Sequence, residues 1–349
     1  MTLEETLEKI HPADKTAMEA ALAHWNNIAM PLHSLGRLQD TVVRIAGMTG
    51  NARVDLKKKA LVVMCADNGV VEEGVTQSGQ EVTKIVAENF LKEKATASIL
   101  CKKAGADIFP VDIGIATDST ILQHKVMYGT KNMAKEPAMT REQAVQALEV
   151  GIHMVEELKE KGYGIIATGE MGIGNTTTSS AVTAVLLEQD PAKVTGRGAG
   201  LSGTGLKKKI SVIRDAIALH KPKKEDPIDV LAKVGGLDIA GMAGGFFGGA
   251  ACRVPGGAGG FISCVAALCA VRICPAGKDY VITSPKSQEP ATMMILEGLG
   301  ITGVLCCDMC LGEGTGAVTI YPILDMALAV YGGMCTFSDN QMENYVPLV

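Results

Sequence analysis

The chain has 349 residues and a formal net charge of −5, with 47% hydrophobic and 20% charged residues. This composition is close to that of an average globular protein, so it excludes a fibrous chain and extensive disorder. The negative charge and the scarcity of basic clusters argue against nucleic acid as a main partner. The length allows a large core in one α/β domain or in two domains.

Cysteine usage and the apolar segments indicate the compartment. The chain has ten cysteines and opens with an acidic amphipathic segment where a secretory leader would be charged and apolar, which predicts reduced thiols in a cytoplasmic protein. The most apolar stretch, 259–277, is interrupted by Arg272 and bounded by glycines and Pro275. It is too short for a membrane span and predicts a buried helix, so we expect no membrane partner.

Taken in chain order, the two ends predict helices and the middle predicts alternating strands and helices. Residues 13–30, 34–48 and 317–335 carry apolar side chains at helical spacing. Short apolar runs predict strands at 60–67, 107–114, 162–169, 252–257, 279–285 and 303–309. Strands that alternate with helices predict an α/β fold with a mostly parallel sheet covered by helices.

The helices at the two ends predict a small helical domain assembled from both ends of the chain. Its expected parts are residues 1–50 and 321–349, and residues 51–320 form the expected large α/β domain. Several predicted strands end on glycine or a polar residue, at the edge of the sheet where open α/β folds bind ligands.

The segment 169–180, GEMGIGNTTTSS, follows a predicted strand and begins a predicted helix, whose free amides would face an anion. A Walker A loop needs Gly-Lys-Ser/Thr, and this segment has no lysine; a Rossmann fingerprint needs a third glycine where Thr177 stands. These departures argue against ATP hydrolysis and dinucleotide redox chemistry. A phosphate-binding loop and a plain tight turn into a helix both remain open.

A second glycine string, 194–209, precedes a basic helix. Arg197 and the lysines at 207–209 offer charge to a phosphate, although such lysines usually lie in solvent. Two glycine-rich segments with a nearby cation suit a monophosphorylated nucleotide better than a triphosphate with magnesium.

Two glutamates follow predicted strands. Glu313, in LGEGTGA, and Glu170, after the strand at 162–169, would face one crevice at the carboxyl edge of the sheet. Burial among apolar neighbours would raise the proton affinity of Glu313 and let it accept a proton near neutral pH. A carboxylate that caps the first turn of the next helix is the alternative interpretation.

The cysteines and histidines give no metal-ligand pattern. CCDMC at 306–310 holds one Cys-x-x-Cys, Cys307 to Cys310, without a second pair or a nearby histidine. We therefore expect buried thiols there and no metal site.

Seven segments in order resemble the nicotinate-nucleotide:dimethylbenzimidazole phosphoribosyltransferases of cobamide lower-ligand synthesis. The segments are SLGRL (34–38), ADNGVVEEGV (66–75), GTKNMAKEPAMTREQA (129–144), GEMGIGNTT (169–177), GGLDIAGMAG (235–244), SPKSQEP (284–290) and LGEGTGA (311–317). The resemblance implies transfer of 5-phosphoribose from nicotinate mononucleotide to an aromatic base, with inversion to an α-riboside phosphate and without metal or cofactor. It also implies a Rossmann-like large domain, a small helical domain and a dimer.

The resemblance implies roles for individual residues. Glu313 is the expected general base, and Glu170 is a second active-site glutamate near the nucleotide. The residues expected to hold the nucleotide and its phosphate are Gly172, Ile173, Gly174, Asn175, Gly198 and Lys209. The residues expected to line the base pocket are Asn68, Ser78, Val86 and Leu311.

Several positions depart from the family's pattern. The family usually has His at Asn68, Gly at His33 and Asp at Gly259, and it often has a polar residue or Met at Val86. Because Asn68 and Val86 belong to the expected base pocket, we hypothesise an acceptor other than dimethylbenzimidazole, such as a purine, another benzimidazole or a phenol. Phenol-activating relatives pair two homologous subunits, so the partner is either a second copy or a homologous subunit.

Two alternatives remain open. One is a catalytically weak paralogue that binds nucleotide and supports a homologous active subunit. The other is an unrelated α/β oxidoreductase or kinase that uses the glycine loops, against which the missing Walker lysine and third Rossmann glycine already count.

Overall fold

The computed structural model describes residues 1–283, 289–305 and 307–346. Its centre is a six-stranded sheet in the order β3-β2-β1-β4-β5-β6, and every neighbouring pair is parallel. The strands are β1 (Lys59–Ala66), β2 (Ala106–Gly114), β3 (Leu122–Gln123), β4 (Ile165–Met171), β5 (Gly256–Ala258) and β6 (Val281–Thr283). This order is that of a doubly wound Rossmann-like sheet, whose direction of winding reverses between β1 and β4.

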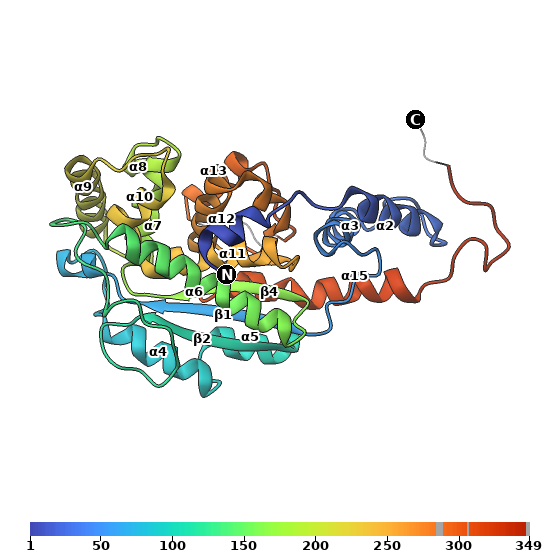
Figure 1. Ribbon diagram of the computed structural model, residues 1–349, viewed down its shortest axis with the longest axis horizontal. Helices are drawn as coiled ribbons and strands as arrows, with labels where there is room; N and C mark the ends of the chain where they lie inside the picture. Colours follow the sequence, from blue (N-terminus) through green and yellow to red (C-terminus); the bar gives the residue numbers. More distant parts are fainter. Residues whose placement is uncertain (284–288, 306, 347–349) are drawn as a thin grey trace.

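Helices cover both faces of the sheet (Figure 1). One face carries α4 (Glu81–Leu91), α5 (Thr96–Ala104) and α14 (Thr315–Thr319). The other carries α6 (Arg141–Glu160) and α11 (Leu237–Ala251), which pack tightly on each other. All eight residues of β1 are buried because the strand is covered on both sides. The predicted α/β fold class is confirmed.

The remaining helices surround this centre. They are α1 (Leu3–Glu8), α2 (Lys15–Asn27), α3 (Arg37–Thr49), η1 (Gly69–Glu73), α7 (Asn175–Leu186), α8 (Pro191–Val194), α9 (Gly203–His220), α10 (Pro227–Val234), α12 (Phe261–Ile273), η2 (Pro275–Tyr280), α13 (Ala291–Leu299) and α15 (Tyr321–Gly333). Helix α12 occupies the apolar stretch that predicts a buried helix, and it is buried over its first ten residues.

The two ends of the chain meet in a second hydrophobic cluster at one end of the molecule (Figure 1). Trp25 from α2, Val42 from α3 and Tyr331 from α15 pack together in it. An antiparallel bridge between Ile28 and Thr336 joins the ends beside the cluster. The two ends of the chain therefore share this second hydrophobic cluster, while the small helical domain, with its expected boundaries at residues 50 and 320, stays a prediction.

The predicted strand at 303–309 is wrong within the described residues. Leu305 forms only an isolated bridge, and the amide of Val304 donates to Thr283 O at 3.2 Å. Asp308 has a φ of 48°, which is incompatible with an extended strand. The described residues of this run therefore form a loop beside β6, and the short edge strand β3 lies outside the predicted strands.

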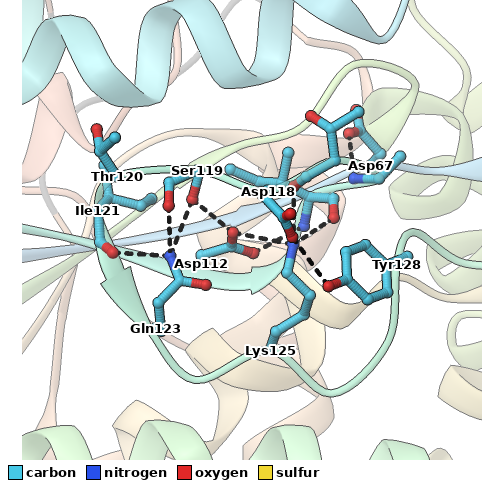
Figure 2. Close-up of polar contacts among 12 residues, drawn as sticks. Asp67, Asp112, Asp118, Ser119, Thr120, Ile121, Gln123, Lys125 and Tyr128 are labelled. Atoms are coloured by element: carbon cyan, nitrogen blue, oxygen red, sulfur yellow. Dashed lines mark hydrogen bonds and ion pairs between the residues drawn. The ribbon is translucent and has the colours of Figure 1, made fainter.

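Polar side chains fix the loop that follows β2 (Figure 2). Lys125 Nζ lies 3.0 Å from Oδ2 of the buried Asp112 and donates to Ile115 O at 2.6 Å. Ser119 Oγ donates to the same carboxylate oxygen at 2.5 Å. The amide of Ala116 in this loop donates to Asp67 Oδ2 at 2.8 Å, which ties the loop to the end of β1.

One segment of the described chain, Thr315–Gly333, is long and apolar enough to cross a membrane by length and composition. Core helices of globular proteins pass the same test, and this segment packs on β4 through α14 and on α3 through α15. Its Asp325 pairs with Lys59 at 2.7 Å, where Lys59 is the first residue of β1.

Candidate active site

A cavity of about 310 Å³ opens at the carboxyl ends of β4 and β5, on the side where the sheet reverses its winding. Open α/β sheets bind their ligands at this place. The lining residues are Val86, Glu170–Ile173, Asn175, Thr176, Gly198, Ala199, Gly259–Ser263, Glu289, Met309–Glu313, Thr315 and Gly316. Both predicted glutamates are among them, so the fold brings together segments far apart in the sequence.

Glu170, the sixth residue of β4, is nearly buried and faces the cavity. Its Oε2 accepts a hydrogen bond of 2.5 Å from Asn175 Nδ2, and its Oε1 accepts one of 3.2 Å from the amide of Glu313. Burial, followed by the nearby charge of Asp238, raises the pKa of Glu170 to about 8. This carboxyl group therefore holds its proton more tightly than a solvated glutamate.

Glu313 lies on the loop between α13 and α14, at a φ of 59°. The loop runs against β4 so closely that a Cβ on Gly169 would lie 2.6 Å from Glu313 O. The side chain turns to α5, where Oε2 accepts a hydrogen bond of 2.9 Å from the amide of Ala97. Burial raises the pKa of Glu313, and the Ala97 bond opposes that change. The carboxyl group of Glu313 therefore binds a proton more tightly than that of a solvated glutamate.

The glycine loop after β4 starts α7. Gly174 caps this helix at a φ of 93°, where a Cβ would lie 2.8 Å from Val71 Cγ2, so a side chain is excluded. Two amides of the loop bond within the protein: that of Ile173 donates to Thr83 Oγ1 at 3.0 Å and that of Asn175 to Gly172 O at 3.0 Å. These two amides are already used, so the loop offers fewer donors to a phosphate than its sequence suggests.

Lys209 is buried with 1% of its surface exposed, whereas its neighbours Lys207 and Lys208 are exposed. Its Nζ donates to Thr176 Oγ1 at 2.7 Å, next to the cavity. A Cβ on Gly198 would lie 2.8 Å from that hydroxyl oxygen, so glycine keeps the approach open. Burial lowers the pKa of Lys209 to about 8, and the charge of Glu289 opposes this change.

Of the residues predicted for the base pocket, Val86 and Leu311 line the cavity and two others do not. Asn68 is fully buried behind the glycine loop, where its Nδ2 donates to Ile173 O and its Oδ1 accepts from Thr178. Ser78 is half-buried in a turn in which its amide donates to Thr76 Oγ1. The structure thus places Asn68 in support of the loop and not at the cavity surface.

Gly259, where the resemblance leads one to expect aspartate, lines the cavity. A Cβ on this residue would lie 1.9 Å from Ala317 N, because α14 packs directly on the end of β5. Any side chain here requires α14 to move. The close packing of α14 on β5 therefore requires a glycine at position 259, where the resemblance leads one to expect aspartate.

The prediction of buried thiols in CCDMC is wrong for Cys307 and Cys310. Both are free and exposed, because the segment is a loop and not a buried strand. Cys306 lies outside the described residues. Over the described ranges, no group of three His, Cys, Asp or Glu side chains is arranged to hold a metal ion.

The sequence analysis assigns no individual function to several residues in and behind the cavity. Thr176 and Asp238 belong to motifs described above, but only as members of a run of hydroxyl residues and of a glycine-rich segment. Phe261 and Ile262 come from the start of α12, and Glu289 follows β6. A sequence signal for such a residue is a charged side chain at a position that helical spacing places among apolar ones. Lys209 is an example, because it shares a buried helical face with Val212, Ile213 and Ala216.

A family model described as Phosphoribosyltransferase matches residues 10–342. A protein from Acetivibrio thermocellus is 48% identical over 348 residues, 99% of each chain, and is named nicotinate-nucleotide–dimethylbenzimidazole phosphoribosyltransferase. A relative of the same name from Ruminiclostridium cellulolyticum is 46% identical over 351 residues, 100% of each chain. The crystal structure of CobT from Thermus thermophilus has a TM-score of 0.90 at 34% identity, covering 95% of this chain and 100% of that one. This chain therefore belongs to the nicotinate-nucleotide–dimethylbenzimidazole phosphoribosyltransferase family.

Proposed function

We propose that this chain transfers 5-phosphoribose from nicotinate mononucleotide to dimethylbenzimidazole, with inversion to the α-riboside phosphate. One observation carries the proposal: Glu170 and Glu313 line one cavity and are joined by the bond from the Glu313 amide to Glu170 Oε1. Two linked carboxyl groups of raised pKa suit a reaction that develops positive charge on a sugar and removes a proton from a base.

The donor phosphate is assigned to the cavity wall formed by the start of α7 and by Gly198. Lys209 supplies positive charge there through its contact with Thr176, and burial strengthens the attraction of that charge for a phosphate. The amides of Ile173 and Asn175 act as supports of the loop, because they bond inside the protein. The remaining amides at the helix start complete the phosphate site.

The reaction follows from the charges. Nicotinate bound through its ring nitrogen is already cationic, so it leaves the ribosyl carbon without a metal or a strong acid. Glu170 faces the cation-like sugar that forms and stabilises it electrostatically. The base nitrogen attacks from the opposite side, and Glu313 takes its proton, which accounts for the inversion.

The acceptor side of the cavity is apolar. Val86, Phe261, Met309 and Leu311 line it, and these side chains suit a methylated bicyclic base. The hypothesis of a different acceptor rested on Asn68 and Val86, and Asn68 does not line the cavity. We therefore place dimethylbenzimidazole first, with purines and phenols as competitors in the test. The expected assembly stays a homodimer or a heterodimer with a homologous subunit.

The test follows product formation by the purified chain with nicotinate mononucleotide and dimethylbenzimidazole, adenine or p-cresol. We expect the highest kcat/KM with dimethylbenzimidazole. Preference for adenine or p-cresol would assign a different acceptor. Absence of turnover until a homologous subunit is added would support the paralogous-subunit alternative.

Glu313→Gln is the matched variant. It keeps the shape of the side chain and its bond from Ala97 but accepts no proton, so we expect kcat to fall about 100-fold or more. Affinity for nicotinate mononucleotide, measured by calorimetry, should stay within about threefold because Glu313 acts on the acceptor. Equal kcat in the variant and the wild type would refute the role of Glu313.

A further inference from the structure

Behind the cavity, a second buried carboxyl group is connected to Glu170. Asp238, the second residue of α11, has 0% of its surface exposed. Asn175 Nδ2 donates to Asp238 Oδ2 at 3.0 Å and to Glu170 Oε2 at 2.5 Å. One amide therefore bridges a carboxyl group that faces the cavity and a carboxyl group that does not line it.

This bridge fixes the orientation of Asn175. An asparagine amide has two N–H donors on its nitrogen and an acceptor on its oxygen. Because both carboxyl groups bind the nitrogen, the amide cannot rotate by half a turn without losing both bonds. Asp238 itself is held by the amide of Ile239, which donates to Oδ1 at 3.0 Å, and by the tight packing of Gly172, whose Cβ would lie 2.8 Å from Oδ2.

Within the described part of the chain, the bridged pair has no neutralising cation. No ion pair of the described residues includes Glu170 or Asp238. The titratable groups that face Asp238 are Glu170 from β4, Cys65 from β1 and Asp67 directly after β1, and Glu313 acts on Glu170 from the other side. All of them are acids, so two negative charges on the bridged pair would repel each other in a site shielded from solvent.

Burial raises the pKa of Asp238 to about 7 and, together with the charge of Asp238, raises that of Glu170 to about 8. Two carboxyl groups this close titrate as one unit, which carries a single proton over a range of pH. A cationic nicotinate ring or ribosyl centre in the cavity favours negative charge on Glu170, and the shared proton then resides on Asp238.

We propose that Asp238 is a positioning residue for the transfer: through Asn175 it holds Glu170 toward the cavity, and it keeps the proton that leaves Glu170 free to carry the negative charge. This inference rests on the proposed function. Asp238 touches neither the donor nor the acceptor, and it acts through the amide.

The experiment compares the pH dependence of kcat in the wild type and Asp238→Asn. The asparagine is a permanently neutral substitute whose single oxygen still accepts from Asn175, while its NH2 group replaces the oxygen that accepts from the Ile239 amide. Glu170 then loses the repulsion that raises its pKa, so we expect the acidic limb of kcat to move to lower pH by about one unit. The kcat at pH 8 should stay within about threefold.

A control experiment tests whether the shift depends on Glu170. It is needed because the titration of Glu313 also shapes the acidic limb of the pH profile of kcat. In a Glu170→Gln background, Asp238→Asn should produce no further shift, because the partner no longer titrates. Asp325→Asn, at the opposite end of β1, should leave the limb of the wild type in place. A shift of equal size with and without Glu170 would overturn the proposal, and so would an unchanged limb in Asp238→Asn.

Infrared difference spectra of the unliganded wild type provide a measurement that does not depend on the folding of the variant or on turnover. We expect a band of a buried protonated carboxyl at pH 6.5 that decreases when the pH is raised to 9. Absence of that band at pH 6.5 would overturn the inference. Failure of the wild type to form product with any base would instead refute the proposed function and leave this measurement valid.

Discussion

Glu313 and Lys209 are charged side chains whose surroundings differ from those of a solvated residue. Glu313 occupies the left-handed region of the backbone, which few residues other than glycine adopt, and this conformation turns its carboxyl group toward Ala97. Lys209 is buried next to two exposed lysines on the same helix. At this scale the sequence identifies the functional residue, and the fold supplies the strain or burial that changes its chemistry.

Lys209→Met should change the pH dependence of stability. Burial lowers the pKa of Lys209 to about 8, so between pH 8 and the unfolded value near 10.5 the unfolded chain binds more protons than the native one. The free energy of unfolding of the wild type should therefore increase as the pH rises through that window, because of Lys209. Urea unfolding at several pH values should show that the gain is lost in Lys209→Met.

The same variant should bind nicotinate mononucleotide about 10- to 100-fold more weakly at pH 7, because it removes the positive charge that we propose for the phosphate site. Lys207→Met, on the exposed side of α9, is the matched control for both measurements. If the free energies of unfolding of Lys209→Met and the wild type changed with pH in the same way, Lys209 would not be the titrating group. Unchanged affinity would remove it from the phosphate site.

At the scale of elements, the contact between α6 and α11 depends on missing side chains. A Cβ on Gly151 would lie 1.9 Å from Gly241 O, and one on Gly244 would lie 1.8 Å from Leu148 O. The helix backbones therefore touch, and α11 can lie directly on β1 and β4. Because Asp238 is at the start of α11, this close packing also places the buried carboxyl group behind Glu170.

Gly151→Ala should lower the free energy of unfolding by about 3 kcal/mol, because the methyl group has no space and the helices must separate. Gly332→Ala is the matched control: it lies in helix α15 with nothing within 4 Å of the added atom. That change should stabilise the protein by about 0.5–1 kcal/mol through helix propensity. Equal effects of the two substitutions in urea unfolding would contradict this account of the helix pair.

Across the whole molecule, α15 connects the sheet to the second hydrophobic cluster, formed by α2, α3 and α15. Its first residue, Tyr321, donates its hydroxyl to Ala60 O in β1 at 2.7 Å. Near its end, the Tyr331 ring lies 4.8 Å from the Trp25 ring, and its hydroxyl donates to Ala52 O at 2.9 Å. The helix thus crosses from one hydrophobic cluster to the other.

Tyr331→Ala should destabilise the second hydrophobic cluster by about 3 kcal/mol and leave the cavity intact. The chain has a single tryptophan, Trp25, so its fluorescence reports on this cluster alone, while circular dichroism reports on the whole chain. We expect the fluorescence transition to precede the circular dichroism transition in thermal unfolding of the variant. Leu219→Ala, exposed on α9, should leave the two transitions unchanged. Coincident transitions in Tyr331→Ala would show that both clusters unfold as one unit.

Much of the fold and of the candidate site could be predicted from the sequence, because the patterns that indicate them are local. Buried strands read as continuous apolar runs, and β1 and β2 begin within one residue of their predicted starts. The motifs around Glu170 and Glu313 identify both glutamates. The run at 303–309 has the apolar composition of a strand, but its described residues form no strand beyond the isolated bridge at Leu305, and Asp308 has a φ of 48°.

The α/β class, the family and the charged residues of the candidate site could be predicted from the amino-acid sequence, because periodicity and ordered motifs are properties of the chain. Which of those residues lie together depends on the folded structure. It placed Asn68 behind the glycine loop, filled the space beside Gly259 with α14, and connected Glu170 to Asp238 through Asn175. Burial and distance arise from the packing of segments far apart in the chain, so no local pattern encodes them.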